Sequence, residues 1–449
     1  MGRLFGTDGA RGIANSELTC ELAMQIGRAA AMVLIDEKIK RPKVMIGMDT
    51  RISSSMLCSA ITAGLCSVGA DVMQLGVLPT PAVAYLVKKY NYDAAVMITA
   101  SHNPCEYNGI KIFQKDGFKL PDELEERIEG IILDGTSVPP VKIGADVGRI
   151  RTSEMPIFDY VRHLEKTIDC TFEEYKVALD CANGASCITA SELFTDLGAD
   201  IHIKSSIPNG VNINRKCGST HLDGLRHLVL ENKCDVGFAF DGDADRMLAI
   251  DENGDVVDGD KVVAICAYDM KQRGLLDKNT AVVTVMSNMG FFKFCEKNGI
   301  NCEKTKVGDR YVLENMRKNG YKIGGEQSGH VIFYDYATTG DGQLTAIQLL
   351  AVMKRTGKKL SELAKMMTTY PQVLINVSVS PFGKLRCEKD KAIAEAVAKV
   401  EKYLGDDGRV LVRVSGTEPL VRVMLEGKDI DQITEYANEI AEVIKERLI

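Results

Sequence analysis

The chain has 449 residues, of which 45% are hydrophobic and 26% charged, and its formal net charge is −7. This length is too great for a single hydrophobic core, so we expect about three or four domains. The negative charge argues against a nucleic-acid surface, and no apolar run is long enough to span a membrane. The 13 cysteines are odd in number and include no C-x-x-C pair, and no signal-like segment follows Met1. We therefore expect reduced thiols and a cytoplasmic location.

Helical and strand patterns alternate along most of the chain. The first set of predicted elements is helices at 17–40, 55–69 and 81–90, with strands at 43–48, 71–76 and 92–98. The pattern starts again at the strand 176–180 and once more at the strand 281–285. We therefore predict an α/β protein with three tandem α/β domains of mixed sheets, over residues 1–150, 151–254 and 255–368.

The last part of the chain follows a different pattern. A strand at 372–379 and a helix at 389–404 precede a hairpin and a closing amphipathic helix from Asp431. This order predicts a smaller α+β domain with an antiparallel sheet over residues 369–449.

The run TASHNP, residues 99–104, follows a strand that reads as buried on both faces. Ser101 and His102 would then lie in a loop at the carboxyl end of a strand, where open α/β sheets place their chemistry. The alternative is an ordinary turn, in which Asn103 and Pro104 serve only as turn residues.

A second polar loop, DGDADR, lies between two strand-like runs and so caps a hairpin. Asp241, Asp243 and Asp245 would repel one another unless a cation lies between them, and oxygen ligands without His or Cys favour Mg²⁺. A calcium-binding helix–loop–helix is disfavoured because Arg246 stands where that loop needs glycine. A solvated acidic turn is the remaining alternative.

A third loop, GGEQSGH, residues 324–330, combines a carboxylate, an amide, a hydroxyl and an imidazole between glycines. Such a mixture suits a polyhydroxylated ligand, because Glu326 can accept from two hydroxyls while Ser328 both donates and accepts. The alternative is a purely structural glycine turn.

A fourth loop, RVSGTEPLVR, residues 413–422, joins two strands in which valines alternate with arginines. Arg413 and Arg422 would point to the face opposite the valines, and the SGT between them supplies hydroxyls and backbone amides for an anion. This pattern is typical of a phosphate clamp. A polar hairpin with solvated arginines is the alternative.

These four loops and FGTDGARG near the N-terminus, in that order from Phe5 to Arg422, resemble the α-D-phosphohexomutases over nearly the whole chain. The resemblance implies four domains around a central cleft, with one loop from each. It also implies an enzyme that interconverts the 1- and 6-phosphates of a sugar. The glutamine of GGEQSGH and the GDRYV run, residues 308–312, are similar to members that act on glucosamine phosphates and supply amino-sugar nucleotides for cell walls.

The resemblance also implies roles for individual residues. Ser101 would carry a phosphoryl group, and one Mg²⁺ would be held by Asp241, Asp243, Asp245 and an oxygen of the phosphoserine. Glucosamine 1,6-bisphosphate would be the intermediate and activator. The catalytic set would be Arg11, His102, Lys111, Arg246 and His330. Lys111 would act as an acid or base if neighbours such as Arg246 lower its pKa.

The same resemblance implies the substrate contacts. Glu326 and Ser328 would hold sugar hydroxyls, and the phosphate that is not transferred would be held by Arg413, Ser415, Gly416, Thr417 and Arg422. Members that act on glucose or mannose phosphates often have a histidine near Asp309, and its absence here leaves His330 as the imidazole of the cleft.

Two alternatives stay open. The first keeps the chemistry with glucose or mannose phosphate as substrate, and the second is a protein that binds sugar phosphates without phosphorylation of Ser101. A phosphatase with Asp241 as nucleophile is disfavoured, because Ser101 and the phosphate clamp would then have no purpose. The expected partner is a small sugar phosphate, with no nucleic acid or membrane, and a homodimer is possible.

Overall fold

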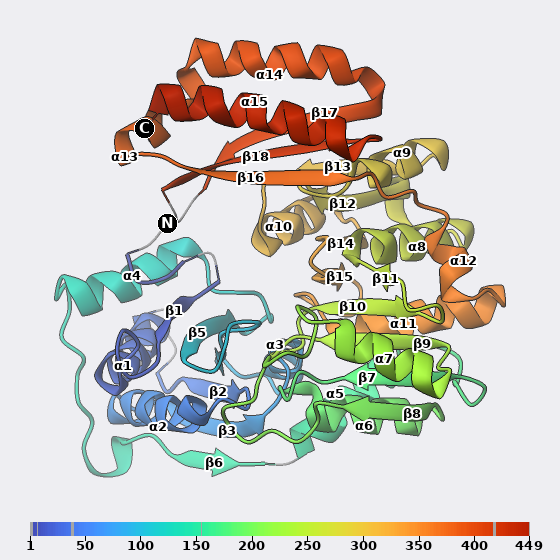
Figure 1. The fold of residues 1–449 in the computed structure, drawn as a ribbon. Coiled ribbons are helices and arrows are strands. Elements are labelled where there is room, and N and C mark those ends of the chain that lie inside the picture. The colour runs from blue at the N-terminus through green and yellow to red at the C-terminus, as the bar shows by residue number, and fades with distance from the viewer. Residues whose placement is uncertain (1–2, 7, 37–39, 154, 416–418, 449) are drawn as a thin grey trace. The chain divides into compact units, whose positions relative to one another are not determined.

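The computed structural model describes residues 3–6, 8–36, 40–153, 155–415 and 419–448. Its contacts divide the chain into two compact units, the first formed by residues 1–286 and 299–366 and the second by residues 287–298 and 367–449. The first unit holds three mixed sheets and the second holds one three-stranded sheet (Figure 1). The predicted fold class, three α/β modules and a smaller α+β module, is therefore confirmed. Within the described part of the chain, no helix is long and apolar enough to cross a membrane.

The first sheet has six strands in the order β1-β5-β4-β2-β3-β6. They are β1 (Ala10–Ile13), β2 (Lys43–Met48), β3 (Asp71–Val77), β4 (Ala94–Ile98), β5 (Tyr107–Gln114) and β6 (Ile150–Thr152). One face is covered by α1 (Cys20–Asp36), α2 (Ile52–Ser67) and α4 (Asp122–Leu133), and the other by α3 (Thr80–Lys89). Every residue of β4 is buried, as expected for a strand covered on both faces.

The second sheet has five strands in the order β11-β10-β9-β7-β8. They are β7 (Lys176–Asp180), β8 (Asp200–Lys204), β9 (Val236–Phe240), β10 (Met247–Asp251) and β11 (Val256–Val257). The accompanying helices are α5 (Met155–Glu165), α6 (Ser186–Asp196) and α7 (Asp223–Asn232). Because Phe238 packs on Phe194 of α6 and the next residue, Ala239, packs with α7, these two helices cover opposite faces.

The third sheet has four strands in the order β13-β12-β14-β15. They are β12 (Thr280–Thr284), β13 (Asn301–Thr305), β14 (Ile323–Gly325) and β15 (Val331–Phe333). The helices of this part of the first unit are α8 (Gly259–Gln272), α10 (Asp309–Asn319), α11 (Gly342–Thr356) and α12 (Leu360–Ala364). Gly324 packs against α10 and Gly325 against α8, so helices cover both faces here too.

The three sheets repeat one topology. In each, two parallel crossovers lead to a central strand, β4, β9 or β14, which then pairs antiparallel with the strand that follows it. The loops that carry Ser101, the three aspartates and Glu326 all follow this central strand. The same step of the topology therefore presents the polar motif in every sheet.

The second unit has an antiparallel sheet in the order β16-β18-β17. Its strands are β16 (Gln372–Ser378), β17 (Gly408–Val414) and β18 (Leu420–Gly427), and its helices are α9 (Met289–Lys297), α13 (Pro381–Arg386), α14 (Lys391–Leu404) and α15 (Ile430–Leu448). Valines of the sheet and apolar residues of α14 and α15, such as Val423, Val400 and Ile440, form one core. This is the predicted α+β arrangement.

Most predicted elements lie within three residues of their observed bounds. The helix predicted from residue 17 begins at Cys20, because the Thr19 hydroxyl accepts from the Leu22 amide at the first turn. Two predicted domain limits fall close to sheet strands, since residue 150 lies in β6 and residue 254 precedes β11, which pairs with β10. The domain ranges themselves stay predictions.

Candidate active site

Ser101 lies in the loop after β4, where it is 1% exposed and has a left-handed backbone with φ of 52°. Its Oγ donates a hydrogen bond to Oδ2 of Asp241 at 2.6 Å, and its amide donates to Oγ1 of Thr99 at 3.0 Å. A non-glycine residue with a left-handed backbone is strained, so the residues around Ser101 must hold it in this conformation. The structure therefore presents the serine hydroxyl to the acidic loop, the loop between β9 and β10 that carries Asp241, Asp243 and Asp245.

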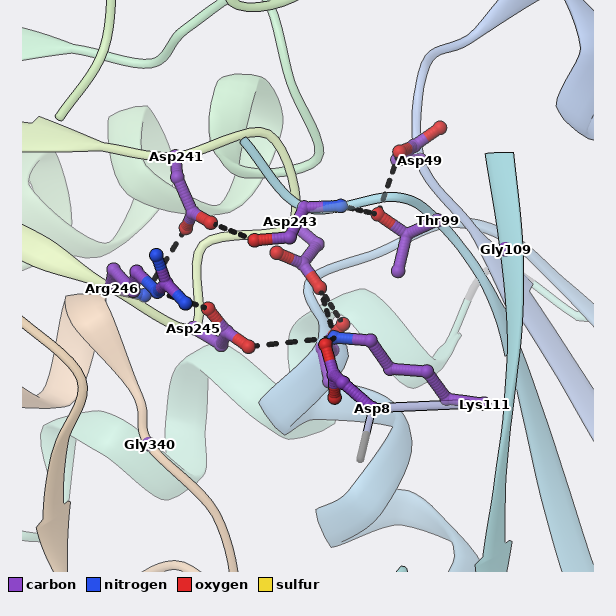
Figure 2. Close-up of polar contacts among 12 residues, drawn as sticks. Asp8, Asp49, Thr99, Gly109, Lys111, Asp241, Asp243, Asp245, Arg246 and Gly340 are labelled. Carbon is purple, nitrogen blue, oxygen red and sulfur yellow. Dashed lines mark hydrogen bonds and ion pairs between the residues drawn. The ribbon is translucent and has the colours of Figure 1, made fainter. Parts of the chain in front are cut away.

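A buried ion pair supports this loop from the neighbouring strand. Arg51 and Asp49 follow β2, both side chains are fully buried, and Nε lies 2.8 Å from Oδ2. The Arg51 guanidinium donates to the carbonyls of Ser101 at 2.9 Å and Asn103 at 2.8 Å. The hydroxyl of Thr99 donates to Asp49 at 2.7 Å (Figure 2). Because β2 and β4 are parallel neighbours, their carboxyl ends bring these residues together.

The loop between β9 and β10 carries three buried carboxylates. Asp241, Asp243 and Asp245 are at most 4% exposed, and each offers an oxygen within 4.8 Å of the others. Burial, followed by repulsion from the other two carboxylates, raises the pKa of Asp241 well above its ordinary value. Oδ1 of Asp243 and Oδ1 of Asp245 are buried and accept no hydrogen bond from the residues that the structure describes. Clustered oxygens with unused lone pairs fit Mg²⁺.

Lys111 extends from β5 toward this acidic loop (Figure 2). Its Nζ lies 3.0 Å from Oδ2 of Asp243 and 3.5 Å from Oδ2 of Asp245. It also lies 3.1 Å from Oδ2 of Asp8. Burial alone lowers the pKa of Lys111, but these carboxylates outweigh burial and raise that pKa above its ordinary value. The pKa of Lys111 is thus raised and not lowered, so the condition under which Lys111 would act as an acid or base is not met among these residues, and its catalytic role stays a prediction.

Asp8 gathers several cations beside Lys111. Arg11 forms an ion pair with Asp8, and Nζ of Lys119 lies 2.6 Å from Asp8 and 2.6 Å from Asp309. Burial raises the pKa of Asp8, but the nearby cations outweigh it and hold that pKa well below the usual value. Arg11 thus belongs to the same cluster as Lys111, and its catalytic role stays a prediction. Sequence reasoning missed Asp8 as a site residue although it lies in FGTDGARG, and missed Lys119, which belongs to no motif.

His102 and Arg246 meet across the two sheets. Nη1 of Arg246 lies 3.2 Å from Nδ1 of His102, and Oγ of Ser101 lies 3.4 Å from the same nitrogen. Burial, and then the charges of Arg246 and Arg11, lower the pKa of His102 to about 4. The imidazole is therefore neutral at physiological pH. Because a guanidinium can only donate, Nδ1 is the acceptor and Nε2 carries the proton.

His330, 2% exposed, reaches the acidic loop from the third sheet. Its Nε2 accepts from the backbone amide of Gly340 at 3.0 Å and lies 3.6 Å from Oδ2 of Asp309. Its Nδ1 lies 3.7 Å from Oδ2 of Asp245. Burial lowers the pKa of His330, but Asp245 and Asp309 outweigh it and raise that pKa. The structure thus places this imidazole among the carboxylates, and sequence reasoning missed the contact with Asp309.

The loop between β14 and β15 carries the predicted sugar-binding residues. Oε1 of Glu326 accepts from the amide of Gly308 at 3.1 Å, which joins the loop to the GDRYV run. Gln327 donates to Asp258 at 3.2 Å. Glu326 is half-buried and Ser328 is exposed, so both side chains can reach a ligand. Their contacts with sugar hydroxyls stay a prediction.

In the second unit, Arg413 of β17 lies directly opposite Arg422 of β18, which in turn lies opposite Asn376 of β16. Opposed residues share a face, so this row crosses the sheet on the side away from Val412 and Val423 of the core. The predicted alternation of valines and arginines is therefore confirmed.

The positive charges of Arg413 and Arg422 favour the binding of an anion at this row. Burial and then the charge of Arg422 lower the pKa of the Arg413 guanidinium, and Nε of Arg413 is buried with no hydrogen-bond partner in the described part of the chain. A bound phosphate would relieve both the repulsion and the missing partner. Ser415, 2% exposed, follows directly after β17. Gly416 and Thr417 lie outside the described residues.

Comparison with known proteins gives one family over nearly the whole chain. Models of the phosphoglucomutase/phosphomannomutase family match alpha/beta/alpha domain I at residues 2–138, domain II at 159–254, domain III at 258–370 and the C-terminal domain at 374–443. A protein of Acetivibrio thermocellus named phosphoglucosamine mutase is 56% identical over 448 residues, covering 100% of both chains.

Solved structures share the fold at lower identity. A phosphoglucomutase/phosphomannomutase family protein from Burkholderia thailandensis has a TM-score of 0.82 at 22% identity, covering 99% of this chain and 98% of that chain. The N-acetylphosphoglucosamine mutase of Aspergillus fumigatus in complex with GlcNAc-6P and magnesium has a TM-score of 0.70 at 17% identity, covering 99% of this chain and 96% of that chain.

Proposed function

This chain belongs to the phosphoglucomutase/phosphomannomutase family, and we propose that it is the isomerase that interconverts glucosamine 6-phosphate and glucosamine 1-phosphate. The 56% sequence identity to a phosphoglucosamine mutase over the full length of both chains supports this substrate. The observation that carries the chemistry is the contact at 2.6 Å between Oγ of Ser101 and the buried carboxylate cluster. A serine fixed beside a cation-binding loop is what a phosphoryl carrier needs.

In the proposed reaction, Ser101 of the resting enzyme carries a phosphoryl group on Oγ. The bond between Oγ and phosphorus breaks while the free sugar hydroxyl loses a proton and forms a bond to that phosphorus. The product is glucosamine 1,6-bisphosphate, and Oγ of Ser101 regains a proton. The bisphosphate turns over in the site and returns its other phosphate to Ser101, so that the phosphoenzyme is restored.

The residues around Ser101 supply charge and orientation. Lys111, Arg11 and Arg246 are positive and lie around the acidic loop and His102, where they can balance the charge of the transferring group. The neutral His102, whose Nδ1 lies 3.4 Å from Oγ of Ser101, would lie beside the transferring group. His330 contacts Asp245 and thereby helps to orient that carboxylate.

The acidic loop is the proposed magnesium site. Asp241, Asp243 and Asp245, with an oxygen of the phosphorylated Ser101, would hold one ion. When bound, Mg²⁺ supplies positive charge against the oxygens of the transferring phosphoryl group. Burial, and then repulsion from the other two carboxylates, raise the pKa of Asp241, and such an ion would relieve the repulsion.

The other two loops are proposed to bind the rest of the substrate. Glu326 and Ser328 would contact sugar hydroxyls, while the remote phosphate would be held by Arg413, Ser415, Gly416, Thr417 and Arg422. The product would supply the synthesis of amino-sugar nucleotides and cell-wall precursors. All 13 cysteines are free, which supports a cytoplasmic location. A homodimer stays a prediction, which light scattering at a known concentration checks.

A coupled assay on the 1- and 6-phosphates of glucosamine, glucose and mannose tests the proposed function. We expect turnover to be fastest on glucosamine phosphates, and intact-mass measurement to find one phosphate on Ser101. The matched variant Ser101→Ala should lose turnover and that mass increment while its melting temperature is unchanged. A higher kcat/KM for glucose or mannose phosphate would reassign the substrate, and normal turnover of Ser101→Ala would refute the mechanism.

A further inference from the structure

The segment between β8 and α7 of the second sheet packs on the Ser101 loop of the first sheet. Asn214 of this segment is 8% exposed. Its Nδ2 donates to the backbone carbonyl of Ser101 at 2.8 Å and to that of Asn103 at 2.9 Å. One amide group thus holds the backbone on both sides of His102.

The backbone around Asn214 is held in an unusual conformation. Asn214 has φ of 57°, and its amide donates to the carbonyl of Ala182 at 2.9 Å. Four other non-glycine residues, in the loop between β7 and α6 and in the segment between β8 and α7, also have a left-handed backbone: Ala182, Asn183, Ser205 and Lys216. Each such residue costs free energy, and strain of this kind gathers where a particular geometry is needed. These loops are therefore built to hold a fixed shape against the first sheet.

Further contacts join the two sheets at this place. The hydroxyl of Thr50 donates to the carbonyl of Asn183 at 2.5 Å, and the amide of Ile52 donates to the carbonyl of Gly210 at 2.9 Å. A Cβ atom placed on Gly242 of the acidic loop would lie 2.5 Å from the Ser101 carbonyl oxygen and 2.9 Å from Nδ2 of Asn214. The Ser101 carbonyl, Asn214 and the acidic loop are thus in direct contact.

We propose that Asn214 is a positioning residue for phosphoryl transfer, an inference that rests on the proposed function. The hydroxyl of Ser101 reaches Asp241 only while Ser101 keeps its left-handed backbone and the first and second sheets keep their positions relative to each other. Arg51 holds the Ser101 carbonyl from within the first sheet, and Asn214 holds the same carbonyl from the sheet that carries the acidic loop. Asn214 therefore fixes the phosphorylated serine relative to the metal ligands, and acts through Ser101.

The test compares Asn214→Gly with the matched variant Asn212→Gly. Glycine at 214 accepts the left-handed backbone and deletes only the amide side chain. Asn212 lies in the same segment, where its Nδ2 donates to Ile207 at 3.0 Å and its Oδ1 accepts from Asn209 at 2.9 Å. Asn212→Gly therefore loosens the segment without touching Ser101.

Steady-state turnover is measured on glucosamine 6-phosphate with Mg²⁺ and glucose 1,6-bisphosphate, together with the melting temperature. For Asn214→Gly we expect kcat to fall by about tenfold to a hundredfold, because a small misplacement of a reacting group has this effect. KM should stay within about twofold of the wild-type value, since Asn214 does not touch the sugar. Asn212→Gly should keep the wild-type kcat even if its melting temperature falls.

The outcomes separate this inference from the proposed function. If the wild-type protein turns over none of the sugar phosphates, the proposed function fails and the role of Asn214 fails with it. If the wild-type protein is active and Asn214→Gly retains its kcat, the role of Asn214 alone is refuted. The same holds if both variants lose kcat in parallel with their melting temperatures, because that result indicates a purely structural segment.

Discussion

At the scale of single residues, the carboxylate of Asp243 links three parts of the site. Its Oδ2 accepts from the Thr80 hydroxyl at 2.6 Å and lies 3.0 Å from Nζ of Lys111, while Oδ1 is the buried oxygen without a donor among the described residues. Two fixed donors aim this carboxylate, so its other oxygen is held ready for a cation. The substitution Asp243→Asn therefore removes one charge from the acidic loop while the side chain keeps its size.

We expect Asp243→Asn to weaken Mg²⁺ binding, because one ligand charge is lost. Ligand binding to the native state stabilises it by about 2.7 kcal/mol at a hundredfold excess over Kd. Addition of MgCl₂ after EDTA treatment should therefore raise the melting temperature and activity of the wild-type protein, and do so much less for Asp243→Asn at the same concentration. Equal responses of both proteins, or full activity in EDTA, would place the metal elsewhere.

Asp341 is a second buried carboxylate, and it caps α11. It accepts from the amide of Leu344 at 3.0 Å and from the hydroxyl of Tyr160 at 3.0 Å. Burial raises the pKa of Asp341 to about 7, although both donors oppose the shift. A carboxyl whose pKa is higher in the folded than in the unfolded chain stabilises the fold when protonated, and this contribution is lost as the pH rises through the folded pKa.

Asp341→Asn keeps the cap and the acceptor for Tyr160 without a titrating group. We therefore expect the melting temperature of the wild-type protein to fall relative to that of Asp341→Asn as the pH is raised from about 5 to about 8. Thermal unfolding of both proteins across this range is the measurement. A difference in melting temperature that does not change with pH would mean that Asp341 keeps its ordinary pKa.

At the scale of elements, the residues directly after each central strand set how closely the Ser101 loop and the acidic loop can approach each other. Gly242 follows β9, and a side chain there would meet the Ser101 carbonyl at 2.5 Å, which is backbone that cannot turn aside. We expect Gly242→Ala to displace one of the two loops and to lower kcat by about a hundredfold. The assay is turnover on glucosamine 6-phosphate with the melting temperature beside it.

The control for this substitution is Gly130→Ala in α4. A Cβ atom there would meet only the side chain of Thr136 at 3.5 Å, and alanine favours a helix over glycine by about 1 kcal/mol. Its activity should equal that of the wild-type protein, with an equal or higher melting temperature. Wild-type turnover of Gly242→Ala would show that the loops tolerate a wider spacing than the structure has.

The arginine row on β17 and β18 should bind phosphate and do no chemistry. A charge-assisted hydrogen bond contributes about 1.5–3 kcal/mol, so Arg413→Ala should lower kcat/KM by about tenfold to a hundredfold. Arg413→Lys should recover only part of the loss, because a point charge does not reproduce the guanidinium fork. Phosphate should stay on Ser101 in both variants. An unchanged kcat/KM of Arg413→Ala, or a loss of its Mg²⁺ dependence, would contradict this role.

Elements and motifs differ in how far the sequence could predict them. Apolar periodicity is local, so it placed β2, β4 and β7 within about two residues. It did not indicate β6, whose three residues are all exposed. Two motifs indicated Ser101 and the three aspartates, because each motif directly follows a run of residues that reads as a strand. They could not indicate contacts such as Asn214 with Ser101, which are 113 residues apart in the chain.

The charges of the site show the same limit. Lys111 was visible within a motif, but the direction of its pKa shift depends on Asp8 and Asp243, which approach it from two other segments. The prediction considered only a cation, Arg246, whose charge would lower the pKa of Lys111. Lys119 follows β5 and Asp309 begins α10, and the two residues pair at 2.6 Å. Neither residue alone indicates the other.

At the scale of the whole molecule, one topology repeated in three sheets brings a serine, a carboxylate cluster and a histidine-bearing loop into contact within the first unit. The proposed function requires that these loops act in one reaction, with Ser101 as the carrier of the phosphoryl group. Binding without chemistry, the open alternative, requires only that the loops hold a ligand. The fate of a phosphate on Ser101 therefore separates the two.

The most direct measurement starts from protein incubated with radiolabelled glucose 1,6-bisphosphate and freed of excess sugar. Unlabelled glucosamine 6-phosphate is then added with Mg²⁺, and the label on protein and sugar is followed in time, with Ser101→Ala as control. We predict that the label is first on Ser101, leaves it within the time of a few turnovers, and appears in glucosamine bisphosphate and then glucosamine 1-phosphate. A protein that takes up no label on Ser101, or keeps it unchanged after the sugar phosphate is added, would contradict the phosphoserine mechanism.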